Sequence, residues 1–437
     1  MNRRNFLYLA GVSAAAATGA RLGSAATISA AETKFDPMKW ESVREQFDLL
    51  ANDQIHLSSF FLTSHPRQVR EEIERHRSAI DASPLEYIEK NMFTMPGKIA
   101  ANVAEYLGGK PEEVAITNST TMGLALIYHG LPLRTGDEIL TTAHDHFVHH
   151  EAARLAAERA GGTVRKVPLY LDPAKASADE MVERIRNATS SRTRVVGVTW
   201  VHSGTGVKLP IRQIATVIEE INRKRTEADR VILIVDGVHG FGIEDEAVAE
   251  LGADFFVAGT HKWIFGPRGT GIVWAKASAW KRLRLVFPAF AEKPFAAWAT
   301  DTKLTAPTEA AWVTQGGFHA FEYEWALPAA FEFHRQIGRA RISERIHGLN
   351  DRCKEGLASI RNVRLYTPLT SKLSAGIICF EISGMESKQV VARLHEKKII
   401  ASTAPYRESY ARLAPSLMNT PEEVEAALRA VRSIAIV

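Results

Sequence analysis

Cysteine is scarce in this sequence of 437 residues, with Cys353 and Cys379 as its only two. A disulfide framework needs more cysteines than this. Cys353 lies in a charged stretch of helical character, DRCKEGL, and Cys379 lies in an apolar, strand-like run, AGIICFEI. We therefore expect two unpaired thiols, with Cys379 buried, and an oxidising compartment is permitted without being required.

The sequence also has little net charge. Lys and Arg number 54 and Asp and Glu number 50, for a formal charge of +4 to which Arg3, Arg4 and Arg21 contribute three positive charges. Nothing in this balance favours a nucleic acid or an anionic membrane surface as a partner. A composition of 46% hydrophobic and 24% charged residues is typical of a globular chain, and the length suffices for a large core and a smaller second domain.

The first 31 residues have the features of an export signal. The string RRNFL precedes a weakly hydrophobic stretch from Phe6 to Ala20, and small residues around Ala25 and Ala31 suit signal peptidase. The paired arginines resemble a twin-arginine (Tat) signal, which a receptor reads. A membrane anchor is disfavoured because the stretch is shorter than the roughly 20 residues that span a bilayer. We predict a cleaved Tat signal peptide over residues 1–31, export by the Tat translocase to the periplasm, and no stable membrane anchor.

Short β-branched runs alternate with amphipathic stretches in the middle of the chain. Segments such as 149–160 and 210–225 carry apolar residues three or four positions apart, as helices do. This alternation predicts an α/β fold whose mostly parallel, seven-stranded sheet is covered by helices on both faces. The expected strands are 113–117, 138–142, 163–168, 194–201, 230–236, 254–260 and 270–275.

The pattern changes after about Phe290, where a loop rich in Phe, Ala and Pro begins. A long helical stretch is expected from about Glu322 to Ile360, followed by short strands mixed with helices. We predict a large domain over residues 32–300 and a smaller α+β domain over residues 301–437.

Polar residues directly after the expected strands are the first candidates for a functional site, because ligands of such sheets bind at the carboxyl ends of the strands. They are Asn118 to Thr121, His144 to His146, His202 to Gly206, Asp236 to His239, and Thr260 to Lys262.

A lysine follows one of these strands in the segment GADFFVAGTHKWIFGPRGTGIVWA, residues 252–275. Burying an ammonium group without a partner is costly and usually lowers its pKa. A lysine that forms a Schiff base needs such a lowered pKa. An isolated lysine is more often a solvated surface cation, but the position of Lys262 favours the Schiff-base role.

A carboxylate ends the apolar strand of RVILIVDGVHGFG, residues 230–242. In enzymes that use pyridoxal 5′-phosphate (PLP), a carboxylate pairs with the protonated pyridine nitrogen and keeps the ring an electron sink. An Asp at a strand end is otherwise commonly a cap or turn residue. Asp236 precedes Lys262 by 26 residues at the end of a neighbouring strand, and the two together favour a PLP site.

The motif D-G-x-H, followed by a strand and T-H-K-W, resembles the class V aminotransferase superfamily and specifically its isopenicillin-N-epimerase-like branch. The resemblance runs from about Leu57 to the C-terminus. It implies a fold type I PLP-dependent enzyme, a homodimer with active sites at the subunit interface, and a reaction in which a substrate amine replaces the lysine in an imine with PLP.

Further motifs match this superfamily residue by residue. TNSTTMGLAL (117–126) resembles its phosphate-binding turn, where Thr120 and Thr121 would supply hydroxyls and the helix start would supply N–H groups. The same run is also a good N-cap. LTTAHDHFVHHE (140–151) resembles the segment that lays an aromatic ring over the pyridine, and this alignment puts His146 in that place.

The resemblance also implies contacts from later segments. TWVHSGTG (199–206) would bring Ser203 near the phenolic oxygen of PLP, which His239 would approach as well, and His261 matches a residue that contacts the phosphate. Arg412 matches the arginine that grips the substrate α-carboxylate, a task suited to a guanidinium fork. The predicted catalytic residues are Lys262, Asp236 and His146, and the predicted cofactor contacts come from Thr120, Thr121, His146, Ser203, Asp236, His239, Thr260, His261 and Lys262.

Other polar residues receive a different interpretation. His144, His149 and His150 are expected on the helix surface or behind the site, and no metal site is expected from them because no Cys or carboxylate completes a usual ligand spacing. Arg407 and Arg268 are weaker candidates for substrate binding, with surface roles favoured.

Three departures from the family pattern narrow the reaction. HEKKIIASTAPYR (395–407) lacks the mobile cysteine of desulfurases and selenocysteine lyases, so persulfide-forming desulfuration is not expected. HLSSFFLTSHP (56–66) has Ser and Phe where the family has Asn and Gly, and TQGGFHAFE (314–322) has Phe318 where many members offer a threonine from the neighbouring subunit. The last two departures put the substrate and part of the phosphate site in question.

An exported enzyme of this branch resembles the periplasmic PLP enzymes that tailor siderophore precursors, notably one that acts on the glutamyl side group of pyoverdine. We predict this function, with a small-molecule or peptide amine as substrate. The alternative is a periplasmic amino-acid lyase, transaminase or epimerase. A non-catalytic binding protein is disfavoured, because such decay would be expected to lose Lys262 or Asp236 and both are present.

Overall fold

The computed structural model describes residues 35–48 and 53–435. The predicted signal peptide, residues 1–31, lies outside the described residues. Residues 36–437 form one compact unit, and the fold below is that of this unit. Within the described residues, no helix has both the length and the apolar character that a membrane crossing requires.

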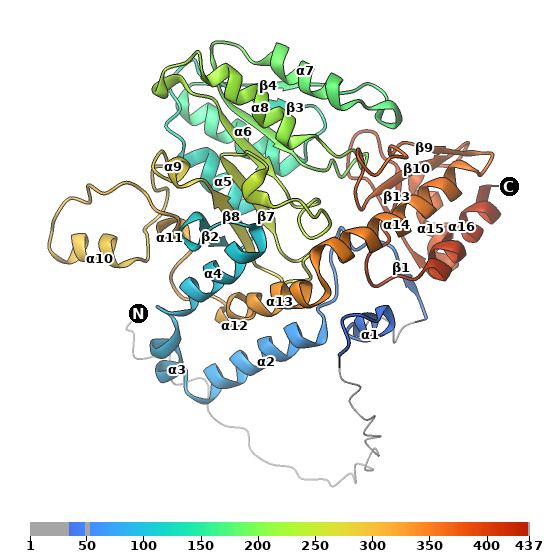
Figure 1. Cartoon of the computed structure of the whole chain (residues 1–437), viewed down its shortest axis with the longest axis horizontal. Helices are drawn as coiled ribbons and strands as arrows, with labels where there is room; N and C mark the ends of the chain where they lie inside the picture. The colour runs from blue at the N-terminus through green and yellow to red at the C-terminus, as the bar shows by residue number, and fades with distance from the viewer. Residues whose placement is uncertain (1–34, 49–52, 436–437) are drawn as a thin grey trace, which may run out of the picture. The chain divides into compact units, whose positions relative to one another are not determined.

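A seven-stranded sheet forms the centre of this unit (Figure 1). Its strands are the seven predicted runs, and no strand end differs from the prediction by more than two residues. The order is β2-β8-β7-β6-β5-β3-β4, and every neighbouring pair is parallel except those that involve β8. The predicted α/β fold with a mostly parallel sheet is therefore confirmed. The strands are β2 (Val114–Thr117), β3 (Glu138–Thr142), β4 (Thr163–Val167), β5 (Thr193–Thr199), β6 (Ile232–Asp236), β7 (Phe255–Gly259) and β8 (Gly271–Ala275).

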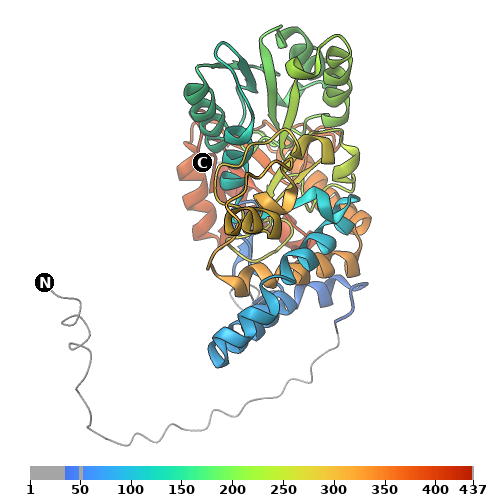
Figure 2. The same ribbon diagram turned by 90° about the vertical axis from the view of Figure 1, so that its left-hand side faces the viewer.

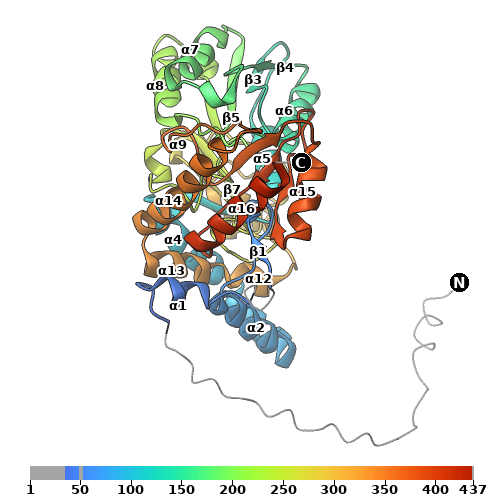
Figure 3. The same cartoon turned by 90° about the vertical axis from the view of Figure 1, so that its right-hand side faces the viewer.

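Helices cover both faces of this sheet, because its central strands are apolar on both sides. Ile232 and Ile234 of β6 pack into a cluster with α5 and α6, whereas the intervening Leu233 points to the other face. The helices α7 and α8 pack against each other, and Figures 2 and 3 show the two helix layers on opposite sides of the strands. These helices are α5 (Thr120–Gly130), α6 (Phe147–Ala160), α7 (Ala178–Ala188) and α8 (Ile211–Asn222).

The C-terminal region builds a second, antiparallel sheet in the order β12-β13-β10-β9, which packs with α14, α15 and α16 around a separate apolar cluster. The short strand β11 (Ile399–Ile400) pairs in parallel with β1 (Ile55–His56), so this region also recruits N-terminal residues. The predicted boundary at residue 301 stays a prediction. The remaining elements here are β9 (Val363–Leu365), β10 (Ile378–Ile382), β12 (Ser402–Thr403), β13 (Ala411–Leu413), α15 (Ser387–Glu396) and α16 (Pro421–Ala435).

The long helical stretch predicted from Glu322 to Ile360 is divided into α12 (Phe321–Trp325), α13 (Leu327–Ile337) and α14 (Arg339–Ala358). Gly338 separates the last two helices with φ of 95°, which the prediction of one continuous stretch missed. The other helices are α1 (Trp40–Arg44), α2 (Arg67–Ala82), α3 (Pro84–Asn91), α4 (Met95–Leu107), α9 (Ala277–Trp280), α10 (Glu292–Ala299) and α11 (Ala310–Val313).

The carboxyl ends of the parallel strands meet at one edge of the central sheet. Thr199 at the end of β5 lies in register with Asp236 at the end of β6, and Asp236 lies in register with Val257 of β7. The polar residues that follow these strands are therefore gathered at a single edge, as the sequence predicts.

Candidate active site

Lys262 lies in a tight loop just beyond β7. The N–H of Gly266 donates to the carbonyl of Thr260 at 2.8 Å and closes a turn that contains Lys262. Burial lowers the pKa of Lys262 to about 8, with Arg412 acting in the same direction and Asp236 opposing both. The amine is thus far easier to deprotonate than a lysine in water.

His239 meets this lysine, with 3.2 Å between Lys262 Nζ and His239 Nε2. The ring is buried, and its pKa is lowered well below the usual value by burial first and by Lys262 second, so the imidazole is neutral. Trp263 Nε1 donates to Nδ1 at 3.5 Å, which leaves the ring proton on Nε2. Nε2 then donates to Lys262 when the amine is neutral, which is consistent with the lowered pKa of the lysine.

Asp236 ends β6 with its side chain 3% exposed, and its Oδ1 accepts from the N–H of Val238 at 3.1 Å. The next residue, Gly237, leaves no room for a side chain, because a Cβ there would lie 1.9 Å from the ring of Phe256. Burial raises the pKa of the Asp236 carboxyl, and His149 is the largest opposing charge, followed after the Val238 hydrogen bond by Lys262.

The start of α5 lies beside the loop of Lys262. Ser119 caps this helix by accepting from Met122 N at 3.1 Å, and Thr120 Oγ1 accepts from the N–H of Gly259 at 2.7 Å. A Cβ on Gly271 would lie 3.2 Å from Ser119 N, a tight contact, so glycine at this position lets the start of α5 approach the sheet closely. Thr121 is exposed one residue further along.

Thr260 and His261, two of the predicted cofactor contacts, lie next to Lys262 and contact other parts of the protein. The hydroxyl of Thr260 donates to the carbonyl of Thr270 at 3.1 Å and so holds the Gly-rich turn. His261 is half-buried against Gly259, and burial followed by the charge of Lys262 lowers its pKa to about 4.

His146 directly precedes α6, and Ser203 follows the end of β5. His146 caps α6, with Nδ1 accepting from Val148 N at 3.3 Å. Burial lowers its pKa, and Asp236, Lys262 and Arg412 are among the charges that act on it. Ser203 Oγ is bonded to the hydroxyl of Tyr406 at 2.6 Å.

Arg412 lies on β13, 4% exposed, and points toward Ser203. Its Nη1 donates to the carbonyl of Ser203 at 2.9 Å, and its Nη2 donates to the carbonyl of Thr403 at 2.7 Å. Nη1 carries a second N–H. The guanidinium carbon, Cζ, lies 4.3 Å from the centroid of the Phe60 ring. The positive charge is therefore held rigidly at the site.

The structure thus brings Lys262, Asp236, His239, His146 and Arg412 to one place, although they come from four separate segments of the chain. It leaves Arg407 and Arg268 exposed.

Sequence reasoning missed two aromatic residues at this site. Phe60 lies under Arg412, and Tyr406 bonds Ser203 and packs edge-on against His146 with 6.1 Å between ring centroids. The doubled phenylalanine of HLSSFFLTSHP was a visible departure from the family pattern. Tyr406 gave no sequence signal beyond its nearness to Arg412.

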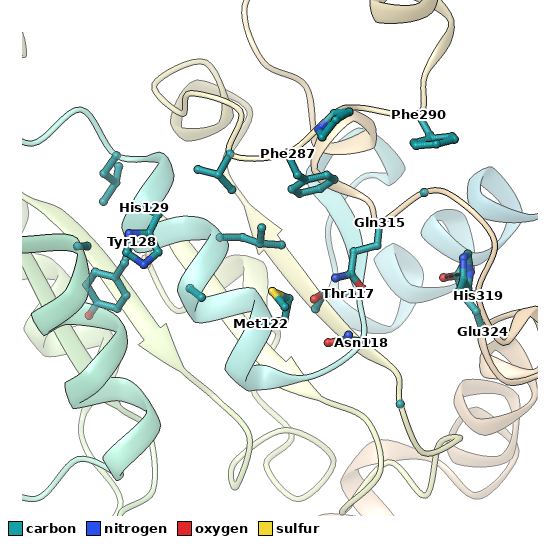
Figure 4. A pocket seen from close by; sticks show the side chains of 18 of the residues that line it. Thr117, Asn118, Met122, Tyr128, His129, Phe287, Phe290, Gln315, His319 and Glu324 are labelled. Atoms are coloured by element: carbon teal, nitrogen blue, oxygen red, sulfur yellow. Dashed lines mark ion pairs between the residues drawn. The ribbon is translucent and has the colours of Figure 1, made fainter. Parts of the chain in front are cut away.

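A cavity of about 1190 Å³ lies along α5, apart from Lys262 and Asp236 (Figure 4). Thr117 and Asn118 lie at the end where α5 begins, and Gln315 and His319 of the segment 314–322 line it as well. Neither Lys262 nor Asp236 lines this cavity. Phe318 is 87% exposed, so this segment offers an apolar side chain to solvent where many members of the resembling family offer a threonine.

The residues present fit PLP. The start of α5 and Thr120 suit an anionic phosphate, because a helix N-terminus presents unpaired N–H groups and a positive dipole end. Asp236 suits a ring nitrogen that must hold a proton, and a lysine with a lowered pKa suits an aldehyde.

Comparisons with known proteins agree with this fit. The sequence model of the family described as aminotransferase class-V matches residues 63–425. The isopenicillin N epimerase of Amycolatopsis lactamdurans is 25% identical over 353 residues, which cover 78% of this chain and 84% of the epimerase. A probable cysteine desulfurase of Vibrio cholerae is 22% identical over 424 residues, 90% of this chain and 97% of the relative.

Solved structures show the same fold. The cystine C–S lyase C-DES, in complex with its product cysteine persulfide, superposes with a TM-score of 0.78 at 21% identity and covers 89% of this chain and 99% of its own. A mutant of C-DES with glycine linked covalently to PLP gives a TM-score of 0.79 at 21% identity, covering 89% of this chain and 98% of its own. With more than four fifths of its length matched by the family, this chain belongs to the class V aminotransferases and is a PLP-dependent enzyme.

Proposed function

We propose that this chain is an exported PLP enzyme that acts on the amino group of an amino acid or an aminoacyl substrate, and that its finer role is the tailoring of a peptide siderophore precursor. The observation that carries the proposal is the pairing of Lys262, whose pKa is lowered to about 8, with Asp236 and Arg412 around one site. A carboxylate, a titrating amine and a buried guanidinium are the groups that binding an α-amino acid to PLP requires.

In this proposal PLP supplies an electron sink next to the substrate Cα. Lys262 Nζ would hold the cofactor and would move a proton at the substrate carbon, and His239 Nε2, which lies 3.2 Å from that amine, would orient it. Asp236 would pair with the ring nitrogen and keep a proton on it. Arg412 binds the carboxylate of the substrate through the second N–H of Nη1, because Nε and Nη2 also donate to the hydroxyl of Ser402 at 3.3 and 3.1 Å.

Persulfide chemistry of the cysteine desulfurase kind is not part of the proposal. Cys353 and Cys379 are both buried and unpaired, and burial raises the pKa of each thiol to about 12. A thiolate nucleophile requires the opposite shift. The names of the desulfurase relatives therefore do not transfer to this chain.

Two features support a role outside the cytoplasm on a peptide substrate. The predicted Tat signal suits an enzyme that acquires PLP in the cytoplasm and crosses the membrane folded. The resemblance to periplasmic siderophore-tailoring enzymes supplies the substrate class, a peptide bearing a glutamyl side group. The second candidate is an amino-acid epimerase, favoured by the isopenicillin N epimerases among the relatives.

One experiment separates these candidates. The purified holoenzyme is incubated with a pyoverdine precursor peptide and, in parallel, with free L-amino acids in deuterated water. A mass change confined to the glutamyl group of the peptide is expected. Deuterium incorporation with inversion of a free amino acid, and no change in the peptide, would instead establish epimerisation and overturn the tailoring role.

A further inference from the structure

Arg412 has little hydrogen-bonding capacity left for a ligand. A guanidinium has five N–H groups, and four of them are used within the protein. Nε and Nη2 donate to the hydroxyl of Ser402 at 3.3 and 3.1 Å, Nη2 also donates to the carbonyl of Thr403 at 2.7 Å, and Nη1 donates to the carbonyl of Ser203 at 2.9 Å. The second N–H of Nη1 is therefore the one that can reach a substrate.

One N–H group is a poor match for a carboxylate. The anion has two oxygens, and arginine binds it best with two parallel N–H groups, one to each oxygen. The ring of Phe60, with its centroid 4.3 Å from Cζ of Arg412, covers one face of the guanidinium. The second oxygen of a bound carboxylate therefore needs a donor from another residue.

A pair of hydroxyls lies beside Arg412. Ser203 Oγ is bonded to the hydroxyl of Tyr406 at 2.6 Å, while the carbonyl of the same serine accepts from Arg412. Two hydroxyls that bond each other carry two protons, and only one of these lies between the two oxygens. Neither hydroxyl has a further hydrogen-bond partner in residues 35–48 and 53–435, so the pair has one O–H group to offer.

Tyr406 is the more accessible member of this pair. Ser203 is 7% exposed, whereas Tyr406 is only half-buried. The tyrosine ring packs on the backbone at Gly204, where a Cβ would lie 3.0 Å from it, and edge-on against His146. Burial raises the pKa of Tyr406 to about 12, although Ser203 and Arg412 act to lower it. The phenol therefore keeps its proton and can donate it.

We propose that the hydroxyl of Tyr406 is a second donor to the substrate carboxylate, alongside the free N–H of Arg412, and that Ser203 donates to Tyr406 and so orients it. Both donors are held by one serine, so their relative position is set before a substrate binds. The inference rests on the proposed role of Arg412 and extends it to a residue of the loop between β12 and β13. It specifies amines with a free α-carboxylate as the substrate class.

The test compares two amines that differ by one carboxylate. Holoenzyme is titrated with glycine and, separately, with methylamine, and the change in the absorption band of the cofactor gives a dissociation constant for each. Tyr406→Phe keeps the ring and removes the hydroxyl. We expect the dissociation constant of glycine to rise about tenfold or more in this variant, because a hydrogen bond to a charged group is lost, and that of methylamine to stay the same.

The matched control is Tyr410→Phe at the other end of the same loop. The ring of Tyr410 stacks on Tyr366 with 3.8 Å between centroids, and its hydroxyl donates to Glu408 at 3.1 Å. Both dissociation constants should be unchanged in this control. A Tyr406→Phe enzyme that binds glycine and methylamine equally more weakly, or both as tightly as the wild type does, would show that the hydroxyl has only a structural role and would overturn the inference.

Arg412→Gln distinguishes failure of the inference from failure of the proposed function. If Arg412→Gln weakens glycine relative to methylamine and Tyr406→Phe does not, only the role of Tyr406 is wrong. If Arg412→Gln leaves the ratio of the two constants unchanged, the carboxylate site itself has been misassigned and the inference fails with it. Should Tyr406→Phe fail to bind PLP, a crystal structure of the wild-type holoenzyme with glycine decides: a Tyr406 hydroxyl within about 3.2 Å of the carboxylate supports the inference, and a carboxylate held without it overturns the inference.

Discussion

The charge state of each group at this site follows from how deeply its side chain is buried. Burial lowers the pKa values of Lys262 and His239 and raises that of Asp236. Burial thus favours the neutral form of each group, and the opposite charges of Lys262 and Asp236 limit the shift of each other. The amine is poised to react near neutral pH as a result.

Asp236→Asn is expected to retain some PLP but to lose turnover by about a hundredfold or more, which corresponds to about 3 kcal/mol in the barrier. The reason is that a carboxylate stabilises the protonated ring nitrogen, and with it the carbanionic transition state more than the ground state. Asp236→Glu should lose less. Turnover per bound PLP, with occupancy read from absorbance, is the measurement.

Asp254→Asn is the matched control, because Asp254 is another buried carboxylate of the same sheet, bonded to the N–H of Leu233 at 2.8 Å. Its turnover per bound PLP should equal that of the wild type. Near wild-type turnover of a fully occupied Asp236→Asn enzyme would show that Asp236 has been assigned the wrong partner.

Uptake of PLP by the apoenzyme should accelerate as the pH rises through about 8 and then level off. The lowered pKa means that Lys262 is protonated and unreactive below this value and is a free amine above it. Stopped-flow absorbance after mixing apoenzyme with PLP gives the rate. A rate that still rises steeply up to about pH 10 would indicate an ordinary lysine and contradict the lowered pKa.

Single residues were predictable where chain position alone carried the signal. Lys262 and Asp236 directly follow apolar strands, and parallel strands place such residues at one edge. Phe60 and Tyr406 were not predictable, because their significance comes from contacts with Arg412 and Ser203, far away in the sequence. His149 was expected on the helix surface or behind the site, and the structure places it fully buried.

Secondary structure elements followed the periodicity of the sequence closely where strands were buried on both faces. The strands β6, β7 and β8 are fully buried, mostly apolar runs, whereas the edge strand β4, with the sequence TVRKV, is partly exposed and was found from its place in the alternating pattern. Helix continuity was harder to predict, because a single glycine in a charged stretch does not distinguish a helix interior from a break. Gly338 breaks the helix, whereas Gly348 lies inside α14.

Gly338→Ala is expected to destabilise the protein by about 1 to 3 kcal/mol. Its φ of 95° lies in a region that strains any residue with a Cβ, although no atom lies within 4 Å of the position that a Cβ would take. Thermal unfolding monitored by circular dichroism measures the loss.

Gly348→Ala is the control within the same helix. Its Cβ would also meet no atom within 4 Å, but Gly348 has helical geometry, so alanine should leave stability unchanged or raise it by up to about 1 kcal/mol. Equal effects of the two substitutions would show that the connection at Gly338 is not the strained break seen here.

The whole molecule combines a PLP enzyme with a predicted Tat signal in residues outside the described part of the chain. The double substitution Arg3→Lys with Arg4→Lys is expected to leave the precursor in the cytoplasm, because the Tat receptor reads the arginine pair rather than charge alone. Fractionation with immunodetection measures this. Periplasmic delivery of the double variant in a strain with only the general secretory pathway would contradict the Tat assignment.

The homodimer predicted from the family resemblance and the exported location stay predictions, because both concern partners that a single chain does not display. The fold and the PLP chemistry lie within one chain, which is why sequence pattern and structure agree on them.

Reduction of the purified holoenzyme with borohydride, followed by mass analysis of its peptides, tests the central claim most directly. A Schiff base of PLP becomes a stable adduct on whichever lysine carries it. We predict a single phosphopyridoxyl adduct on the peptide that contains Lys262, and none at that position in Lys262→Ala, which retains any PLP only noncovalently. A stoichiometric adduct on any other lysine of the wild-type enzyme would contradict the account.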